Sequence, residues 1–258
     1  MPTPSPPPPP TPAALPAPLP GAEPRPAIDL LFVDAHLAVA NKPCGLLVHR
    51  GWDNDDDVAL FRVRDAIGAY VYPVHRLDRG TSGALLFARS AEVAAALGTS
   101  LQAGGLEKRY LALVRGTPPA QGMIDHPIPR DETKGAARLA AVTQFRLVAR
   151  STVDRCSLVE AIPHTGRLHQ VRRHLRHLNH PLVGDVNYGS GEINRHYRAA
   201  YDLRRLALHA HYLAFTHPAT GARIVVRAPM TADLAGPLAA LGLPDFVDDQ
   251  VAVPDAVP

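Results

Sequence analysis

One carboxylate, Asp78, lies between two arginines in the stretch PVHRLDRGTSGALLFARS, directly before the tripeptide Thr-Ser-Gly. Aspartate followed by glycine and hydroxyl residues is typical of a turn, so the carboxylate could simply cap that turn. The alternative rests on Arg76 and Arg79, because a neighbouring guanidinium stabilises the ionised form of a carboxylate. An ionised carboxylate can act as a nucleophile or a base. In an extended strand Arg76 and Asp78 would share one face, with Leu77 pointing into the core.

A second informative stretch, HTGRLHQVRRHLRHLNH, contains four arginines, five histidines and no acid. Its apolar residues recur at intervals of three and four, which predicts an amphipathic helix from Arg167 onward. Arg172 and Arg176 would lie one turn apart on another face, as would His169 and Arg173. The helix therefore presents a dense cationic surface.

Three interpretations of this cationic helix are open. Its histidines could bind zinc, but their spacing and the intervening arginines match no common ligand pattern. The face could be solvated without a partner, although helix faces usually mix the two signs of charge to limit repulsion. An anionic partner removes the repulsion, so we favour phosphate binding and expect neither a metal nor a cofactor.

Composition separates a folded core from two tails. The first 26 residues contain 13 of the 27 prolines, which predicts a disordered proline-rich tail over residues 1–26. Residues 244–258 contain four acids and no base, and we expect a loose C-terminal tail. Residues 27–243 then form the folded core, whose 26 basic and 19 acidic side chains give a formal charge of +7. Such a charge favours a polyanionic partner.

Cysteine usage and hydropathy predict a reduced, soluble protein of the cytoplasm. Cys44 and Cys156 are far apart and match no metal-ligand spacing, which argues against a disulfide scaffold. No apolar run approaches the roughly 20 residues of a membrane span, and the N-terminus lacks the pattern of a signal peptide. We expect no membrane partner.

The order of elements predicts an α+β fold with a mixed, largely antiparallel sheet core and flanking helices, because strands are many and no regular strand-helix-strand alternation is visible. Helices are expected over residues 55–70, after a cap at Ser90, and over residues 231–242. Strands are expected over residues 72–77, 84–88, 106–116, 139–150, 156–165, 206–218 and 222–229.

Five segments together resemble one enzyme family. HRLDRGTSG is similar to the signature of the RluA-type pseudouridine synthases, whose aspartate is catalytic. LAVANKPCGLLVHR, EKRYLALVRG, TGRLHQVRRHL with HPLVGD, and LALHAHYLAFTHPATG resemble further motifs of that family, in the family's order. The likeness covers residues 28–230. It implies a pseudouridine synthase fold with a central cleft over residues 27–243, and an enzyme that isomerises uridine to pseudouridine in RNA.

Within the family, the details look closest to the subgroup that modifies position 65 of tRNA. Two departures put that target in question: the loop between Gly116 and Leu139 is short, and Gly80 stands where the subgroup often has proline. The same isomerisation on ribosomal RNA therefore stays open. So does a non-catalytic RNA-binding factor, although the family's functional residues are intact.

The resemblance implies roles for four residues. Asp78 assists cleavage of the glycosidic bond, either by attacking the sugar or by removing a ribose proton. Tyr110 matches the active-site tyrosine that stacks on the uracil. Arg172 matches the ion-pair partner of the catalytic aspartate, and Arg167 is a weaker candidate for that role.

We also expect the protein to bind RNA, and to act as a monomer. Arg76 would enter the space that a flipped uridine leaves, and Leu208 would pack against the base. The other residues expected to contact the RNA are His75, Arg79, Arg167, His169, Arg173 and Arg176.

Overall fold

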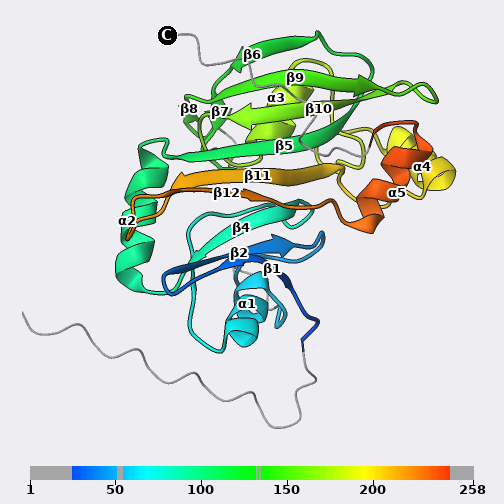
Figure 1. Ribbon diagram of the computed structural model, residues 1–258. Coiled ribbons are helices and arrows are strands. Elements are labelled where there is room, and N and C mark those ends of the chain that lie inside the picture. Colours follow the sequence, from blue (N-terminus) through cyan, green and yellow to red (C-terminus); the bar gives the residue numbers. More distant parts are fainter. Residues whose placement is uncertain (1–24, 51–54, 132, 134, 245–258) are drawn as a thin grey trace, which may run out of the picture.

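The computed structural model describes residues 25–50, 55–131, 133 and 135–244 (Figure 1). Nearly all of the two expected tails, residues 1–24 and 245–258, lies outside the described residues. Residues 51–54, 132 and 134 lie outside them too. Among the described residues, no helix is both long and apolar enough to cross a membrane.

Most of the described chain is organised around a ten-stranded sheet. Its order is β1-β2-β4-β11-β5-β10-β9-β6, with β12 paired to β11 and β3 paired to β4. The strands are β1 Asp29–Val33, β2 Leu37–Lys42, β3 Tyr72–Pro73, β4 Ser82–Ala88, β5 Leu106–Arg115, β6 Gln121–Asp125, β9 Val142–Arg150, β10 Cys156–Pro163, β11 Leu208–Thr216 and β12 Arg223–Arg227. A separate hairpin pairs β7 Ile128–Pro129 with β8 Arg138–Leu139. All pairings between the named strands are antiparallel except that of β4 with β11, which confirms the predicted fold class.

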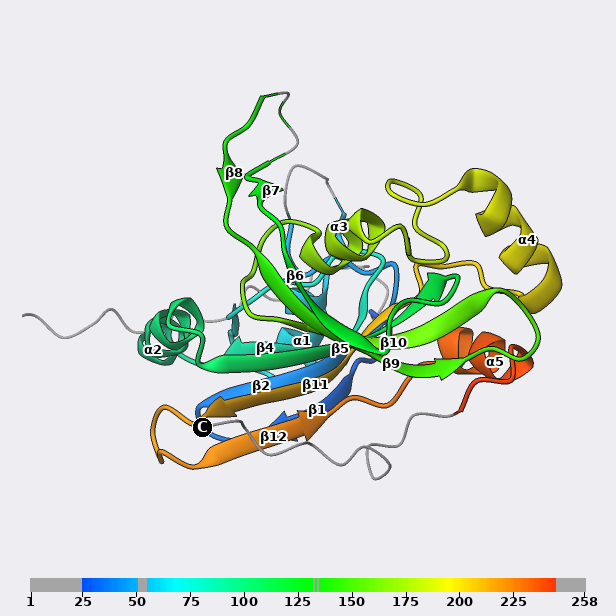
Figure 2. The same cartoon turned by 90° about the horizontal axis from the view of Figure 1, so that it is seen from above.

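The helices of the described chain cover the two halves of the sheet separately. They are α1 Ala59–Ile67, α2 Ala91–Gln102, α3 Gln170–His177, α4 Gly191–Tyr201 and α5 Ala232–Ala240. Apolar side chains of α1 pack on β2 and β4, and those of α2 pack on the opposite face of the same strands. In the other half, α3 packs on β5, β9 and β10, while α4 and α5 pack on the opposite face of β5 and β10. Figures 1 and 2 place α2 at one end of the strands and α4 with α5 at the other.

The two halves meet at a seam, which we define as the junction of β4, β11 and β5. The parallel contact of β4 with β11 is short, pairing Ser82 with His209 and Gly83 with Ala210. Gly83 has φ +115°, and a Cβ there would lie 2.3 Å from the Ala210 carbonyl oxygen. The glycine of the Thr-Ser-Gly tripeptide is therefore required by the close approach of the two strands.

Local sequence signals and tertiary contacts disagree at two segments. The strand expected over residues 72–77 ends at Pro73, so the prediction that Arg76 and Asp78 share a strand face is wrong. Beyond this point the His75 ring replaces a main-chain acceptor, and its Nε2 accepts a hydrogen bond from the Leu86 N–H at 3.2 Å. The cationic helix begins at Gln170 rather than at residue 167, after a left-handed residue at position 169.

Candidate active site

A cavity of about 470 Å³ opens where the seam meets α3. Its lining joins segments that are far apart in the sequence: the turn before β4, strand β5, the start of β11, and the approach to α3. The predicted site residues in its lining are Arg76, Asp78, Tyr110, Arg167, His169, Arg172 and Leu208. The fold thus brings together the carboxylate, the tyrosine and the arginine to which the resemblance assigns the chemistry.

Asp78 directs its carboxylate into this cavity rather than capping its own turn. The main chain closes the turn, with the Thr81 N–H donating to the Asp78 carbonyl at 3.0 Å. One carboxylate oxygen, Oδ2, accepts a hydrogen bond from Arg172 Nη1 at 3.0 Å. The other, Oδ1, lies 3.8 Å from His169 Nε2, and 20% of the side chain is exposed. One face of the carboxylate is held while the other can meet a ligand.

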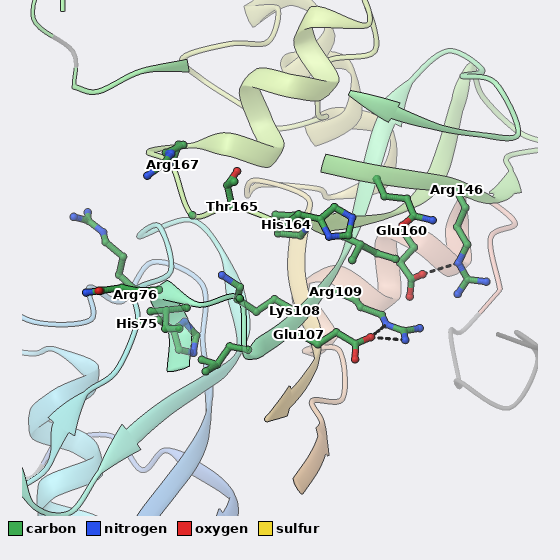
Figure 3. A pocket seen from close by; sticks show the side chains of 18 of the residues that line it. His75, Arg76, Glu107, Lys108, Arg109, Arg146, Glu160, His164, Thr165 and Arg167 are labelled. Carbon is green, nitrogen blue, oxygen red and sulfur yellow. Dashed lines mark hydrogen bonds and ion pairs between the residues drawn. The ribbon is translucent and has the colours of Figure 1, made fainter. Parts of the chain in front are cut away.

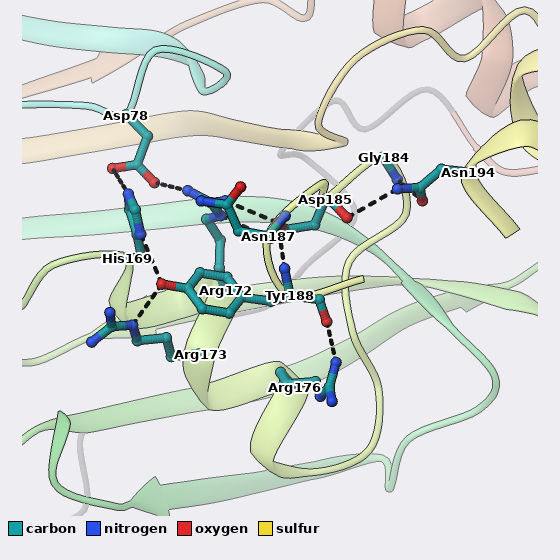
Figure 4. A network of polar contacts seen from close by, with 10 residues as sticks. All are labelled: Asp78, His169, Arg172, Arg173, Arg176, Gly184, Asp185, Asn187, Tyr188 and Asn194. Atoms are coloured by element: carbon teal, nitrogen blue, oxygen red, sulfur yellow. Dashed lines mark hydrogen bonds and ion pairs between the residues drawn. The ribbon is translucent and has the colours of Figure 1, made fainter. Parts of the chain in front are cut away.

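Arg172 is fixed by a second, fully buried carboxylate (Figure 4). Its Nε and Nη2 donate to the two oxygens of Asp185 at 2.8 and 2.9 Å. Asp185 in turn accepts the main-chain N–H groups of Asn187 and Tyr188, both at 3.0 Å. Burial favours neutral Arg172, but the hydrogen bonds and charges of Asp185 and Asp78 outweigh it and raise the pKa of Arg172. The guanidinium therefore stays charged and cannot rotate away from Asp78.

The arginines that flank Asp78 in sequence do not form its ion pair. Arg79 points away from the cavity, donating from Nε to the Gly45 carbonyl at 3.0 Å and pairing with Asp55 at 3.0 Å. The expectation that both neighbours hold the carboxylate is therefore wrong for Arg79. Arg76 is exposed and lines the cavity. The partner of Asp78 comes instead from 94 residues further along the chain.

Tyr110 and Leu208 supply apolar surface opposite the polar groups. Tyr110 packs against the core clusters of both halves of the sheet, and Leu208 is 3% exposed. Burial, and then the charge of Asp78, raises the pKa of the Tyr110 phenol, so it stays protonated near neutral pH. A flat, uncharged ring beside a carboxylate can receive a nucleobase by stacking.

Arg173 and Arg176 of the cationic helix bind protein rather than line the cavity. Arg173 donates to the Tyr188 hydroxyl at 2.8 Å and to the Pro129 carbonyl at 3.2 Å, and Arg176 donates to the Tyr188 carbonyl at 2.5 Å. His169 Nδ1 lies 2.9 Å from the same hydroxyl. These contacts hold the Asp185 loop over α3, as Figure 4 shows.

The zinc interpretation of this helix finds no support in the described residues, where no group of three or more His, Cys, Asp or Glu side chains could hold a metal ion. The two ring nitrogens of His174 lie 2.8 Å from Thr143 Oγ1 and 2.9 Å from the His126 carbonyl. His177 stacks on the ring of His126, with their centroids 3.8 Å apart. His174 is therefore buried with protein partners, while His177 is exposed and stacks on His126.

A larger cavity of about 1140 Å³ adjoins the first one (Figure 3). The residues that line both are Arg76, Lys108, Pro163, Thr165, Gly166 and Arg167. His75, expected to contact RNA, lies in the wall of the larger cavity. Burial, followed by the charge of Lys108, lowers the pKa of His75 to about 3, so its ring is neutral at pH 7. It therefore adds no charge for binding a phosphate.

A buried carboxylate, Glu160, lies in the wall of this larger cavity. Its Oε2 accepts from Arg146 Nε at 2.6 Å, and its Oε1 lies 3.0 Å from His211 Nε2. Burial alone would raise the pKa of Glu160. The hydrogen bonds from His211 and Arg146 outweigh burial and lower the pKa to about 2, against an ordinary value of 4.5.

Acid should therefore remove the stabilising contribution of Glu160. Its pKa is lower in the folded state, so the contribution is full above about pH 4.5 and is lost as the pH falls through about 2. Glu160→Gln should lower the free energy of unfolding by about 3 kcal/mol at pH 7. The gap between the two proteins should close toward pH 2. Urea unfolding at a series of pH values measures this gap, and a gap independent of pH would contradict the assignment.

A buried network joins Ser82, which follows the turn of Asp78, to β11. The His209 Nε2–H donates to the Ala228 carbonyl at 3.0 Å, so Nδ1 is free to accept the Ser82 hydroxyl at 2.8 Å. Ser82 Oγ accepts from Arg205 Nη2 at 2.7 Å, and the same nitrogen donates to the Leu208 carbonyl at 3.2 Å. Burial lowers the pKa of His209 to about 4, which keeps it in this neutral form. Each of these hydrogen-bond donors in the network therefore has an acceptor.

Replacing Arg205 with methionine should lower the free energy of unfolding by about 3 kcal/mol, because the buried acceptors around it lose their charged donor. Arg204→Met is the matched control. The Arg204 side chain is 73% exposed and pairs with Asp202, so its loss should cost less than about 1 kcal/mol. Chemical denaturation of the two variants measures both effects. Equal losses in the free energy of unfolding would show that the buried network stabilises the fold no more than the exposed ion pair does.

Three residues in or next to the two cavities have no role in the sequence prediction. Asp185 lies in the quoted segment HPLVGD, but nothing local shows that it faces Arg172. Lys108 precedes Tyr110 by two residues, a spacing that would have placed both on one strand face. Thr81 lines the smaller cavity with a buried hydroxyl that has no hydrogen-bond partner among the described residues.

Comparison with known proteins agrees with this geometry. The family model described as RNA pseudouridylate synthase matches residues 36–177. A protein named tRNA pseudouridine synthase C from Pasteurella multocida (strain Pm70) is 42% identical over 77% of this chain and 90% of its own. One of the same name from Vibrio cholerae serotype O1 is 37% identical over 83% of this chain and 96% of its own. The solved structure of human RNA Pseudouridylate Synthase Domain Containing 1 superimposes with a TM-score of 0.67 at 26% identity, covering 83% of this chain and 89% of that one.

Proposed function

The chain belongs to the RNA pseudouridylate synthase family, and we propose from this premise that it isomerises uridine to pseudouridine in tRNA with Asp78 as the catalytic carboxylate. The observation that carries the assignment is the ion pair of Asp78 with Arg172 in a cavity that also contains Tyr110. The carboxylate is thereby held next to a surface suited to a base.

The reaction breaks the bond between ribose C1′ and uracil N1, turns the base, and forms a bond from C1′ to C5. The proton on C5 is lost and N1 gains one, so no oxidant and no second substrate is consumed. Asp78 can assist by attacking C1′ or by removing the proton on C2′, and its Oδ1, which does not contact Arg172, is available for either step. Arg172 holds the other oxygen and keeps the carboxylate aimed at the sugar.

A uridine inside a stem must leave its stack before Asp78 can reach the sugar, which costs a few kcal/mol. Stacking of the base on Tyr110 returns about 1 to 3 kcal/mol. Arg76 is exposed at the rim of the cavity, where its guanidinium can fill the space that the base vacates. Leu208 closes the opposite side of the base site.

The RNA target is the finer part of the proposal. The curated relatives at 37 to 42% identity are named tRNA pseudouridine synthase C, which supports tRNA over ribosomal RNA. We place the modified uridine at position 65, as the subgroup resemblance suggests. We further propose that the protein acts as a monomer in the cytoplasm, in contact with RNA alone.

Tritium release from transcripts labelled at uracil C5 tests the target. We expect release from a tRNA transcript and none once uridine 65 is replaced by cytidine. A ribosomal RNA transcript serves as the comparison. Release from the ribosomal transcript alone would overturn the tRNA assignment, and release from neither would overturn the enzymatic one.

A further inference from the structure

The ammonium of Lys108 lies where the two cavities meet, and no carboxylate of the described residues forms an ion pair with it. The residue is on β5, two positions before Tyr110, so the two side chains leave the strand on the same face. Among the residues that the structure describes, none forms an ion pair or a hydrogen bond with Lys108 Nζ. Burial lowers the pKa of Lys108, which records the cost of keeping this charge away from water.

The acids of the larger cavity are already neutralised by other cations. Glu107 pairs with Arg109 at 2.6 Å and with Arg223 at 2.7 Å. Glu160 is held by Arg146 and the nearby histidine of β11. Neither carboxylate is left to balance Lys108.

Two further cations face the same opening. Arg76 and Arg167 line both cavities with Lys108, and no carboxylate of the described residues pairs with either of them. Figure 3 shows the Lys108 side chain reaching toward the side where Arg76 and Arg167 lie, with its nitrogen below Thr165. A Cβ added to Gly166 would lie 4.0 Å from Lys108 Nζ, so the 165–167 turn passes directly over the ammonium. Three cationic side chains, Arg76, Lys108 and Arg167, therefore line the region that the two cavities share.

We propose that Lys108 binds a phosphodiester next to the target uridine, and that the larger cavity receives the adjoining nucleotide of the RNA. The inference rests on the proposed function. A phosphate would supply the negative partner that Lys108 lacks among the described residues. The cavity volume of about 1140 Å³ exceeds what a small ligand needs.

The spacing along β5 fits this arrangement. Two residues of a strand cover about 7 Å, so the Cα atoms of Lys108 and Tyr110 lie one pleat apart on the same face of β5. The long Lys108 side chain can therefore reach a phosphate beside a base that stacks on Tyr110. In the proposed complex, Tyr110 contacts the base and Lys108, on the same strand, contacts the RNA backbone.

A chemical double-mutant cycle tests the contact. The RNA is a substrate stem-loop in which the phosphate on the 5′ or the 3′ side of the target uridine is replaced by a neutral methylphosphonate. With unmodified RNA, Lys108→Met should weaken binding at least about tenfold, mostly through KM rather than kcat, and should reduce the salt slope of binding by about 0.7 to 0.9. Lys108→Arg, which keeps the charge, should restore most of the affinity.

One of the two methylphosphonates should weaken binding by the wild-type protein as strongly as Lys108→Met does, and should add nothing in that variant. Arg198→Met, which removes an exposed cation of α4, should leave the affinity and both methylphosphonate effects unchanged. Equal methylphosphonate effects in the wild type and in Lys108→Met would overturn the contact. So would a loss confined to kcat.

The cycle separates this proposal from the enzymatic one. Affinity is read by fluorescence anisotropy, which needs no turnover, while product formation is measured in parallel. An absence of product from every RNA, with coupling between Lys108 and one phosphate intact, would sink the proposed function alone. Full product formation without that coupling would sink only the phosphate site.

Discussion

Asp78→Asn is expected to lower kcat at least about 1,000-fold while leaving the affinity for tRNA within about threefold. The amide has nearly the shape of the carboxylate, and its oxygen can still accept from Arg172 Nη1, which lies 3.0 Å from Oδ2 in the wild type. What disappears is the anion, and with it the nucleophile or base. Tritium release gives kcat, and filter binding with the same RNA gives the affinity.

Asp202→Asn provides the matched control for this substitution. Asp202 has a 76% exposed side chain at the end of α4 and a left-handed φ of 54°, which asparagine accepts readily. The control should keep full activity. If Asp78→Asn turned over tRNA at a comparable rate, the catalytic assignment of Asp78 would be refuted.

Much of the fold can be predicted from local sequence patterns. Ser90 is predicted to cap α2, and its Oγ accepts the Val93 N–H at 3.3 Å. The apolar repeat of the cationic segment predicts α3, since burying one face is a local requirement. Helix α4 is not predicted, because among its residues only Tyr197 is buried and the apolar repeat is correspondingly weak.

The site depends on contacts that local patterns do not encode. The sequence places Arg79 beside Asp78, yet the chain turns there and Arg79 meets Asp55 instead. The counter-ion of Asp78 comes from α3, and only the family resemblance identified it. Lys108 lacks a partner altogether among the described residues, and an unmet charge becomes visible only once its surroundings are known.

Arg172→Met is expected to have the second-largest effect, and it should act on stability and catalysis together. Asp185 has no solvent exposure, and the loss of Arg172 leaves its charge with main-chain donors alone. We expect the free energy of unfolding to fall by about 3 to 5 kcal/mol. Asp78 would lose its fixed orientation at the same time, so kcat should fall about 100-fold or more in the fraction that remains folded.

A second variant separates the two effects of Arg172. Arg172→Met combined with Asp185→Asn removes the unpaired buried charge, so it should regain a large part of the lost stability. It should not regain activity, because Asp78 still lacks its partner. Arg172→Lys keeps the charge but cannot donate to both oxygens of Asp185 and to Asp78 in one planar arrangement, so its kcat should stay well below wild type. Urea unfolding and tritium release on the three variants measure the two effects separately. Recovery of kcat in the double variant would show that Arg172 serves the fold and not the carboxylate.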